Sequence, residues 1–200
     1  MNTKMTTLPG YRLNEYQLVL NPPVAFREKL NSVREDFKTS YKESQVSTRP
    51  YLTLVKFRVW EMMEEKIVQR LKVIGMGATP FKLQTKDFGS FPTHSIFINV
   101  VTKLPVQDLV RQIKTVQRLL KSPESDPHFL QDPHFSIVTR LPPGYYEKAW
   151  LEYSHRQFTA SFIADGMLLL KRKAGEKRFE IVERLEFMNL PVSIKQGELF

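Results

Sequence analysis

The apolar residues recur with two spacings, and these predict an alternation of helices and strands. Apolar side chains every three or four positions from Phe26 to Phe37 predict an amphipathic helix. The polar face of this helix, which we expect in solvent, comprises Arg27, Lys29, Arg34 and Glu35. The same spacing predicts three further helices, over residues 60–74, 105–121 and 145–153.

Strand-like runs lie between these helices. They span residues 15–20, 50–57, 81–85, 95–102, 134–139, 157–164, 167–171 and 179–187. Gly75 and Gly77 are predicted to end the second helix, and residues 88–92 to form a loop between two strands. Asp165-Gly166 predicts a hairpin turn, and residues 173–177 a second turn. Because three strands follow one another at the end of the chain, we predict an α+β fold with antiparallel or mixed sheets.

The composition is that of an ordinary globular protein. Of its 200 residues, 42% are hydrophobic and 26% are charged, unlike a disordered chain. This length predicts one bilobal domain over residues 1–190, followed by a C-terminal tail over 191–200. The absence of cysteine excludes disulfides, a thiolate zinc site and a cysteine nucleophile. With no apolar run of membrane-spanning length and no signal-like start, we expect a cytoplasmic monomer without a membrane partner.

The charge balance is the one unusual feature of the composition. Thirty Lys and Arg residues against 21 Asp and Glu residues give a formal net charge of +9. Such a surplus favours a polyanionic partner, for example a nucleic acid or a nucleotide. The alternative explanation is that the surplus charge only keeps the protein soluble, and the charge by itself does not locate a site.

Two strand segments repeat one pattern of residue types. Residues 50–55 (PYLTLV) and 133–138 (PHFSIV) both contain proline, a ring, an apolar residue, a hydroxyl, an apolar residue and valine. Because side chains alternate along a strand, the ring and the hydroxyl share a face, which places Tyr51 with Thr53 and His134 with Ser136. The residues expected in hydrophobic layers are Leu52, Leu54, Phe135 and Ile137. A pseudo-twofold relation between the halves would bring the polar pairs together across a groove.

These repeated strands resemble the His-x-Thr/Ser motifs of the two-histidine phosphoesterase superfamily, which includes 2′-5′ RNA ligase-like proteins and cyclic nucleotide phosphodiesterases. The segments 16–23 and 88–92 also resemble bacterial members. The resemblance implies a bilobal fold with the motif strands side by side in a basic cleft, and no cofactor. It further implies that one histidine is the general base, and that the other protonates the leaving ribose oxygen of a 2′,3′-cyclic phosphate or a related diester.

Tyr51 departs from this family pattern, whereas Thr53, His134 and Ser136 match it. An imidazole with a pKa near 6.5 suits proton transfer at neutral pH, but a phenol with a pKa near 10 stays protonated. Tyr51 can therefore donate a hydrogen bond or a proton, but it is a poor base. Three alternatives remain open for it: an altered catalytic role, a stacking or hydrogen-bonding role, and loss of catalysis.

Other residues are candidates for binding the substrate. Thr53 and Ser136 are expected to donate hydrogen bonds to phosphate oxygens. The candidate cations are Lys56 and Arg140, which follow the motif strands, and Lys82, Lys171, Arg172 and Lys173. The candidate stacking rings are Phe91, Tyr145 and Tyr146. Of the remaining histidines, His94 is a candidate for the cleft edge, and His128 and His155 are interpreted as a loop residue and a solvated residue. Such scattered histidines predict no metal site.

Our first hypothesis is a phosphoesterase that acts on nucleotide or RNA phosphodiesters such as 2′,3′-cyclic phosphates. Thr53 and Ser136 would bind the phosphate, His134 would act as acid or base, and Tyr51 would occupy the partner position. The alternative, motivated by Tyr51, is a non-catalytic module of the same fold that binds RNA or nucleotide phosphate. A third hypothesis is a protein-interaction role with no ligand in the groove.

Overall fold

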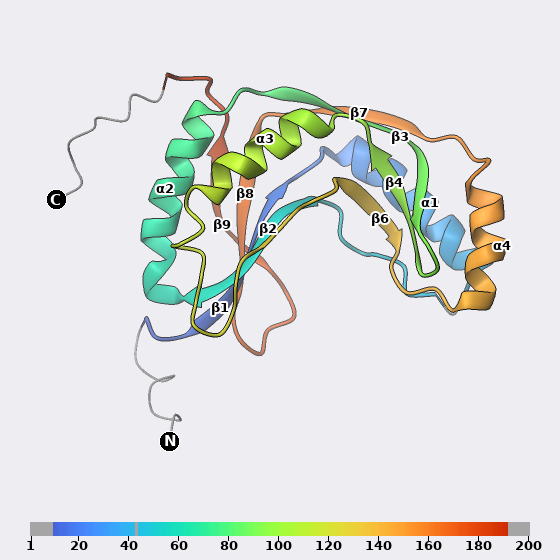
Figure 1. Ribbon diagram of the computed structural model, residues 1–200, viewed down its shortest axis with the longest axis horizontal. Helices are drawn as coiled ribbons and strands as arrows, with labels where there is room; N and C mark the ends of the chain where they lie inside the picture. Colours follow the sequence, from blue (N-terminus) through green and yellow to red (C-terminus); the bar gives the residue numbers. More distant parts are fainter. Residues whose placement is uncertain (1–9, 43, 192–200) are drawn as a thin grey trace.

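Two antiparallel sheets form the two lobes of the molecule (Figure 1). The computed structural model describes residues 10–42 and 44–191, so most of the predicted tail lies outside the described residues. Sheet A has the strand order β5-β2-β1-β8-β9, and sheet B has the order β6-β4-β3-β7. The predicted bilobal α+β fold is thereby confirmed.

The strands and helices lie close to the predicted positions. Sheet A contains β1 (Leu13–Leu20), β2 (Leu52–Trp60), β5 (His128–Phe129), β8 (Gly166–Arg172) and β9 (Glu180–Glu186). Sheet B contains β3 (Phe81–Phe91), β4 (Ser95–Val100), β6 (His134–Val138) and β7 (Thr159–Ala164). The helices are α1 (Val24–Ser40), α2 (Glu64–Gly77), α3 (Lys103–Lys114) and α4 (Pro143–Tyr153), with a short 3-10 helix, Glu61–Met63, before α2. No helix in the described residues is long and apolar enough to cross a membrane.

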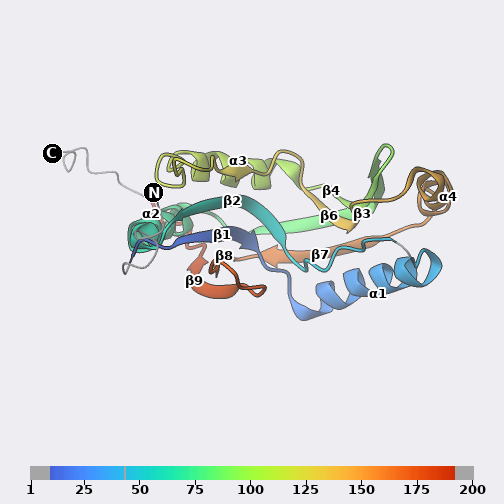
Figure 2. The same ribbon diagram turned by 90° about the horizontal axis from the view of Figure 1, so that it is seen from below.

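The chain passes repeatedly between the lobes. Helix α1 follows β1 of sheet A but packs against β6 and β7 of sheet B, whereas α2 packs against β8, β9 and α3. Seen from below, α1 and α3 lie on opposite sides of the molecule (Figure 2). The apolar side chains of both lobes form one continuous buried cluster. Because the two sheets share this core, their relative position is set by close packing.

The predicted loop at residues 88–92 is wrong, because β3 continues to Phe91. Phe88 to Phe91 pair with Ile98 to Ser95 of β4, so the turn lies at residues 92–94. A Cβ atom on Gly89 would lie 2.6 Å from the ring of Phe97. This glycine therefore makes room for a ring of the neighbouring strand and does not mark a turn.

The predicted hairpin at Asp165-Gly166 is also wrong. Strand β7 pairs with β3 in sheet B, and β8 pairs with β1 and β9 in sheet A, so the chain changes sheets here. A Cβ atom on Gly166 would lie 2.7 Å from the carbonyl oxygen of Leu185. Glycine is therefore needed here because the backbones of residue 166 and β9 lie too close together for a side chain. The second predicted turn is confirmed: it joins β8 to β9 and contains Gly175 with φ of 86°.

Two helix boundaries differ from the prediction. Helix α2 begins at Glu64, because Trp60 still belongs to β2, and it runs through Gly75 to Gly77. A Cβ atom on Gly75 would lie 3.0 Å from the carbonyl oxygen of Glu186, so this glycine lets the helix approach β9. Helix α3 ends at Lys114, and residues 115–119 continue only as turns.

We predict that Gly166→Ala lowers the free energy of unfolding by about 1–3 kcal/mol, since the new methyl group meets backbone rather than a flexible side chain. Urea denaturation would measure the loss. Gly144→Ala is the matched control, because a Cβ atom there meets nothing within 4 Å and the residue lies in the first turn of α4. Equal stability of the two variants would contradict the close-approach explanation.

Candidate active site

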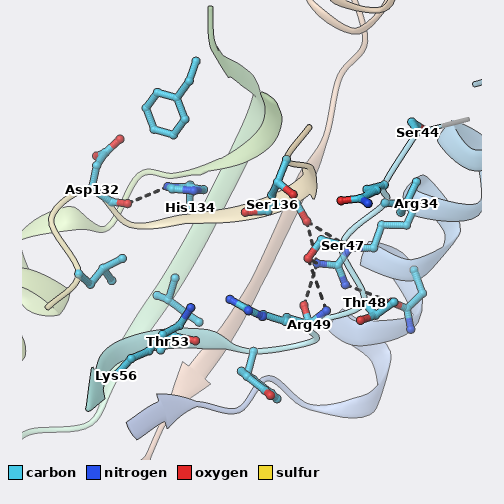
Figure 3. Close-up of a pocket in the computed structure, with 18 of the residues that line it drawn as sticks. Arg34, Ser44, Ser47, Thr48, Arg49, Thr53, Lys56, Asp132, His134 and Ser136 are labelled. Atoms are coloured by element: carbon cyan, nitrogen blue, oxygen red, sulfur yellow. Dashed lines mark hydrogen bonds between the residues drawn. The ribbon is translucent and has the colours of Figure 1, made fainter. Parts of the chain in front are cut away.

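A cleft of about 1320 Å³ lies between the two motif strands (Figure 3). The resemblance implied that these strands lie side by side, but β2 belongs to sheet A and β6 to sheet B. Both edges of β2 are paired, with β1 and β5. Strand β6 pairs with β4 on one edge and, on the other, with Val46, while Ser47 donates to the carbonyl of Ile137. The motif strands therefore face each other as the walls of a cleft.

Each motif strand carries a β-bulge one residue after its hydroxyl. In β2, Thr53 lies opposite Val19 and Val55 opposite Leu18, so Leu54 is the extra residue. In β6, Ser136 lies opposite Phe97 and Val138 opposite Ile96, so residue 137 is the extra residue. The sequence repeat is thus also a repeat of backbone geometry.

The bulges change which residues face the cleft. Without them, Val55 and Val138 would share a face with the hydroxyls, but both valines are fully buried. The residues that follow these valines line the cleft instead: Lys56 in β2, and Thr139 directly after the end of β6. The interruption of the alternation therefore brings a cation to one wall and a third hydroxyl to the other.

The four motif residues come together as the repeat predicts. Tyr51, Thr53, His134 and Ser136 all line the cleft and are half-buried. The intervening residues are buried in the core, as expected; they are Leu52, Leu54, Phe135 and Ile137.

His134 is held in one tautomer. Its Nδ1 lies 2.8 Å from the carbonyl oxygen of Asp132, an acceptor, so Nδ1 carries a proton and donates it. The imidazole packs against Phe97 and Phe91, with ring centroids 4.6 and 5.3 Å away. Burial lowers the pKa of His134 below its usual value, although the Asp132 carbonyl opposes this effect. At neutral pH, His134 is therefore an uncharged imidazole whose Nε2 has a lone pair.

Tyr51 has the opposite tendency. Burial raises the pKa of its phenol above the usual value, and the nearby charges of Arg49 and Arg172 only partly offset this effect. The phenol keeps its proton at neutral pH, so it is a hydrogen-bond donor and not a base.

Arg34 lies under the cleft, contrary to the predicted solvent-facing position. Only 3% of the residue is exposed. Its guanidinium donates to the carbonyl oxygen of Ser136 at 2.8 Å and to that of Arg49 at 2.7 Å. Burial lowers its pKa to about 10, which leaves it charged at neutral pH. Helical periodicity places Arg34 on the polar face of α1, but the segment 44–49 packs over that part of the helix. The periodicity of a helix does not indicate which other segment covers it.

Two cations meet beside Thr53. Arg49 lies between the walls of the cleft, and Lys56 lies next to Thr53 on β2 (Figure 3). Burial lowers the pKa of Lys56, and the positive charge of Arg49 lowers it further. Like charges repel when brought together without an anion, so this corner of the cleft favours a phosphate group. The motif pattern indicated Lys56 but contains no signal for Arg49.

His128 also lines the cleft, although it was interpreted as a loop residue. It forms β5 with Phe129 and lies opposite Lys56. Two residues are too short a strand to be detected by alternation. In the described residues, no group of three or more His, Cys, Asp or Glu side chains could hold a metal ion.

The remaining predicted site residues lie elsewhere, except for Phe91, which lines the cleft. Arg140 is exposed after β6, because the bulge directs Thr139 into the cleft. His94 lies in the β3–β4 turn, and Tyr145 lies at the start of α4, where it contacts the ring of Tyr41. The other candidates that do not line this cleft are Lys82, Lys171, Arg172, Lys173 and Tyr146.

The bilobal α+β fold and the two facing motif strands are those of the two-histidine phosphoesterase class, although Tyr51 replaces the first motif histidine. The sequence model of the 2'-5' RNA ligase superfamily matches residues 22–176, and the chain belongs to that superfamily. The resemblance stated from the motifs is therefore confirmed. No curated protein matches the sequence significantly.

Solved structures share the fold at low sequence identity. TT0787 of Thermus thermophilus has a TM-score of 0.65 and 16% identity, over 87% of this chain and 98% of that one. E. coli LigT complexed with 3'-AMP has a TM-score of 0.60 and 14% identity, over 88% and 98%. LigT has also been solved with NADP+ and with ATP. At these identities the likeness concerns the fold.

We predict that Arg34→Met lowers the free energy of unfolding by about 1–3 kcal/mol, because it leaves the carbonyls of Ser136 and Arg49 without their donor. Urea denaturation would measure this loss. Arg70→Met, on the exposed face of α2, is the control and is expected to change stability by less than about 0.5 kcal/mol. Similar values for the two variants would contradict a structural role for the buried guanidinium.

Proposed function

We propose that this protein is a phosphoesterase that hydrolyses 2′,3′-cyclic phosphodiesters of nucleotides or RNA. The observation that carries the proposal is that Thr53, Ser136 and His134, from different sheets, line one cationic cleft. Nucleotides fit the charge of this cleft, and the related fold of E. coli LigT has been solved with 3'-AMP and with phosphate.

His134 serves as the general base. Its Nδ1–H is committed to the carbonyl of Asp132, and Nε2 is left to accept a proton from the attacking water. The lowered pKa keeps this nitrogen unprotonated at neutral pH. The Asp132 side chain forms an ion pair with Lys103 at 2.7 Å, which restrains the segment that orients the imidazole.

The hydroxyls and cations bind the phosphate. Thr53 and Ser136 donate hydrogen bonds to its non-bridging oxygens from opposite walls, and Arg49 compensates the negative charge that develops there. Water forms a new bond to phosphorus as the bond to one ribose oxygen breaks. Fixed donors lower the barrier because they need no reorganisation during the reaction.

The leaving ribose oxygen takes its proton from the β2 wall. Tyr51 and Lys56 both carry protons there, but burial raises the pKa of Tyr51 and lowers that of Lys56. Burial thus makes the Lys56 ammonium a stronger acid than usual and the Tyr51 phenol a weaker one. We therefore assign Lys56 as the proton donor and Tyr51 as a hydrogen-bond donor. The site thereby accommodates a phenol where the family motif has histidine.

A second candidate function is a non-catalytic module that binds nucleotide or RNA phosphate in the same cleft. The raised pKa of Tyr51 favours it, since a phenol that keeps its proton cannot act as a general base as an imidazole can at neutral pH. Both functions need the phosphate-binding groups, and only hydrolysis needs the lone pair of His134. Incubation with 2′,3′-cyclic nucleotides and cyclic-phosphate RNA distinguishes them by turnover.

We predict that activity rises as the pH increases through a pKa below 6.5, because His134 must be unprotonated and its pKa is lowered. His134→Ala is expected to reduce kcat by about 10²–10⁴-fold and to remove this acidic limb. A pH–rate profile of both proteins would measure these effects. His155→Ala, at an exposed position after α4, is the control. If His134→Ala keeps the turnover of the wild type, His134 is not the general base.

We predict that Tyr51→His increases kcat for cyclic phosphates, because it installs an imidazole beside Thr53 without disturbing the second motif. Steady-state kinetics of the purified variant would measure the gain. Tyr51→Phe is the matched control, since it keeps the ring and removes only the phenolic hydroxyl. If wild type and Tyr51→His both bind nucleotide without any turnover, the binding-module function replaces hydrolysis.

A further inference from the structure

A second cavity, of about 430 Å³, is lined by β1, β2 and the turn between β8 and β9. The turn lies beside the start of β1 (Figure 1). The lining residues are Leu13, Glu15, Arg58, Arg172, Lys173, Ala174, Gly175 and Glu176. None of them lines the cleft between the motif strands. The second cavity is therefore a separate surface feature.

The two cavities lie on the same face of sheet A. Lys56, which lines the cleft, and Arg58, which lines the second cavity, are two residues apart on β2 and so share a face. Arg58 lies opposite Glu15, and Glu15 lies opposite Arg172 of β8. Two residues of a strand span about 7 Å, comparable to the step between successive phosphates of an extended nucleotide chain.

Three cations, Arg58, Arg172 and Lys173, line the second cavity against two carboxylates, Glu15 and Glu176, which leaves a formal surplus of one positive charge. Glu15 accepts hydrogen bonds from Arg172 and from Gln17, so its charge is compensated. The guanidinium of Arg172 also lies 4.8 Å from the ring centre of Phe179. Arg58 is exposed and has no ion-pair partner among residues 10–42 and 44–191, and the ammonium of Lys173 is 3.8 Å from Glu180. Arg58 is therefore able to bind an anion directly, and Lys173 can do so by exchanging its long, exposed ion pair with Glu180 for a phosphate.

We propose that the second cavity is a subsite for the backbone phosphates of a single-stranded RNA whose 3′-terminal phosphate occupies the cleft. The inference rests on the proposed function for the position of that terminal phosphate. Arg58 and Lys173 bind the phosphates on the 5′ side of the terminal phosphate. The RNA chain runs along β2, from Lys56 in the cleft to Arg58 in the second cavity. A mononucleotide accordingly fills only the cleft, whereas a longer chain occupies both cavities.

The test compares two probes that differ in length. Uridine 3′-monophosphate reaches only the cleft, and a 3′-phosphorylated oligouridylate reaches both cavities. Isothermal titration at several salt concentrations is expected to show tighter and more salt-dependent binding of the oligonucleotide. Arg58→Gln and Lys173→Gln are each expected to weaken oligonucleotide binding by about tenfold and to flatten its salt slope, since each removes one charged contact. Binding of the mononucleotide stays unchanged.

The control variant is Arg118→Gln, which removes an exposed cation that lines neither cavity. Equal affinities of wild type for the two probes would overturn the subsite. So would an oligonucleotide affinity that Arg58→Gln and Lys173→Gln reduce no more than the control does. Length-dependent binding that needs Arg58 and Lys173, but without turnover of cyclic phosphates, would support the subsite and contradict the proposed hydrolysis.

Discussion

The buried guanidinium of Arg34 is the interaction on which the geometry of the site depends. It joins helix α1, the carbonyl of Arg49 before β2 and the carbonyl of Ser136 within β6. One side chain thereby fixes the position of both motif segments relative to the same helix. A charged group is costly to bury, and its hydrogen bonds to carbonyl oxygens offset much of that cost. The positive charge that remains lies directly beneath the cleft.

The crossing of the chain between the lobes has a related effect. Helix α1 leaves sheet A and packs on sheet B, and the chain returns from β7 in sheet B to β8 in sheet A. Neither lobe is therefore a continuous segment of the sequence. The walls of the cleft are held by connections at both ends, so groups on opposite walls keep fixed positions relative to one another.

The fold and the centre of the site were largely predictable, because they follow from periodicity and from a repeat. Local sequence could not show that Gly166 permits close contact with another strand instead of forming a hairpin. It also could not place Arg49 and Arg34 in the cleft, since the segment 44–49 has no periodic pattern and its position depends on long-range hydrogen bonds. The bulges explain why Lys56 faces the cleft and Arg140 does not: strict alternation fails one residue after each hydroxyl.

The matched bulges have a consequence for how a ligand is oriented. If the two walls also carried equivalent side chains, a phosphodiester would fit about equally well in either of two opposite directions. The side chains at equivalent positions remove this degeneracy, because Lys56 corresponds to Thr139 and Tyr51 corresponds to His134. The β2 wall carries two proton donors, the Tyr51 phenol and the Lys56 ammonium, whereas the β6 wall carries the uncharged imidazole of His134 and the hydroxyl of Thr139. The duplicated backbone therefore supplies the scaffold, and its unequal side chains give the site a direction.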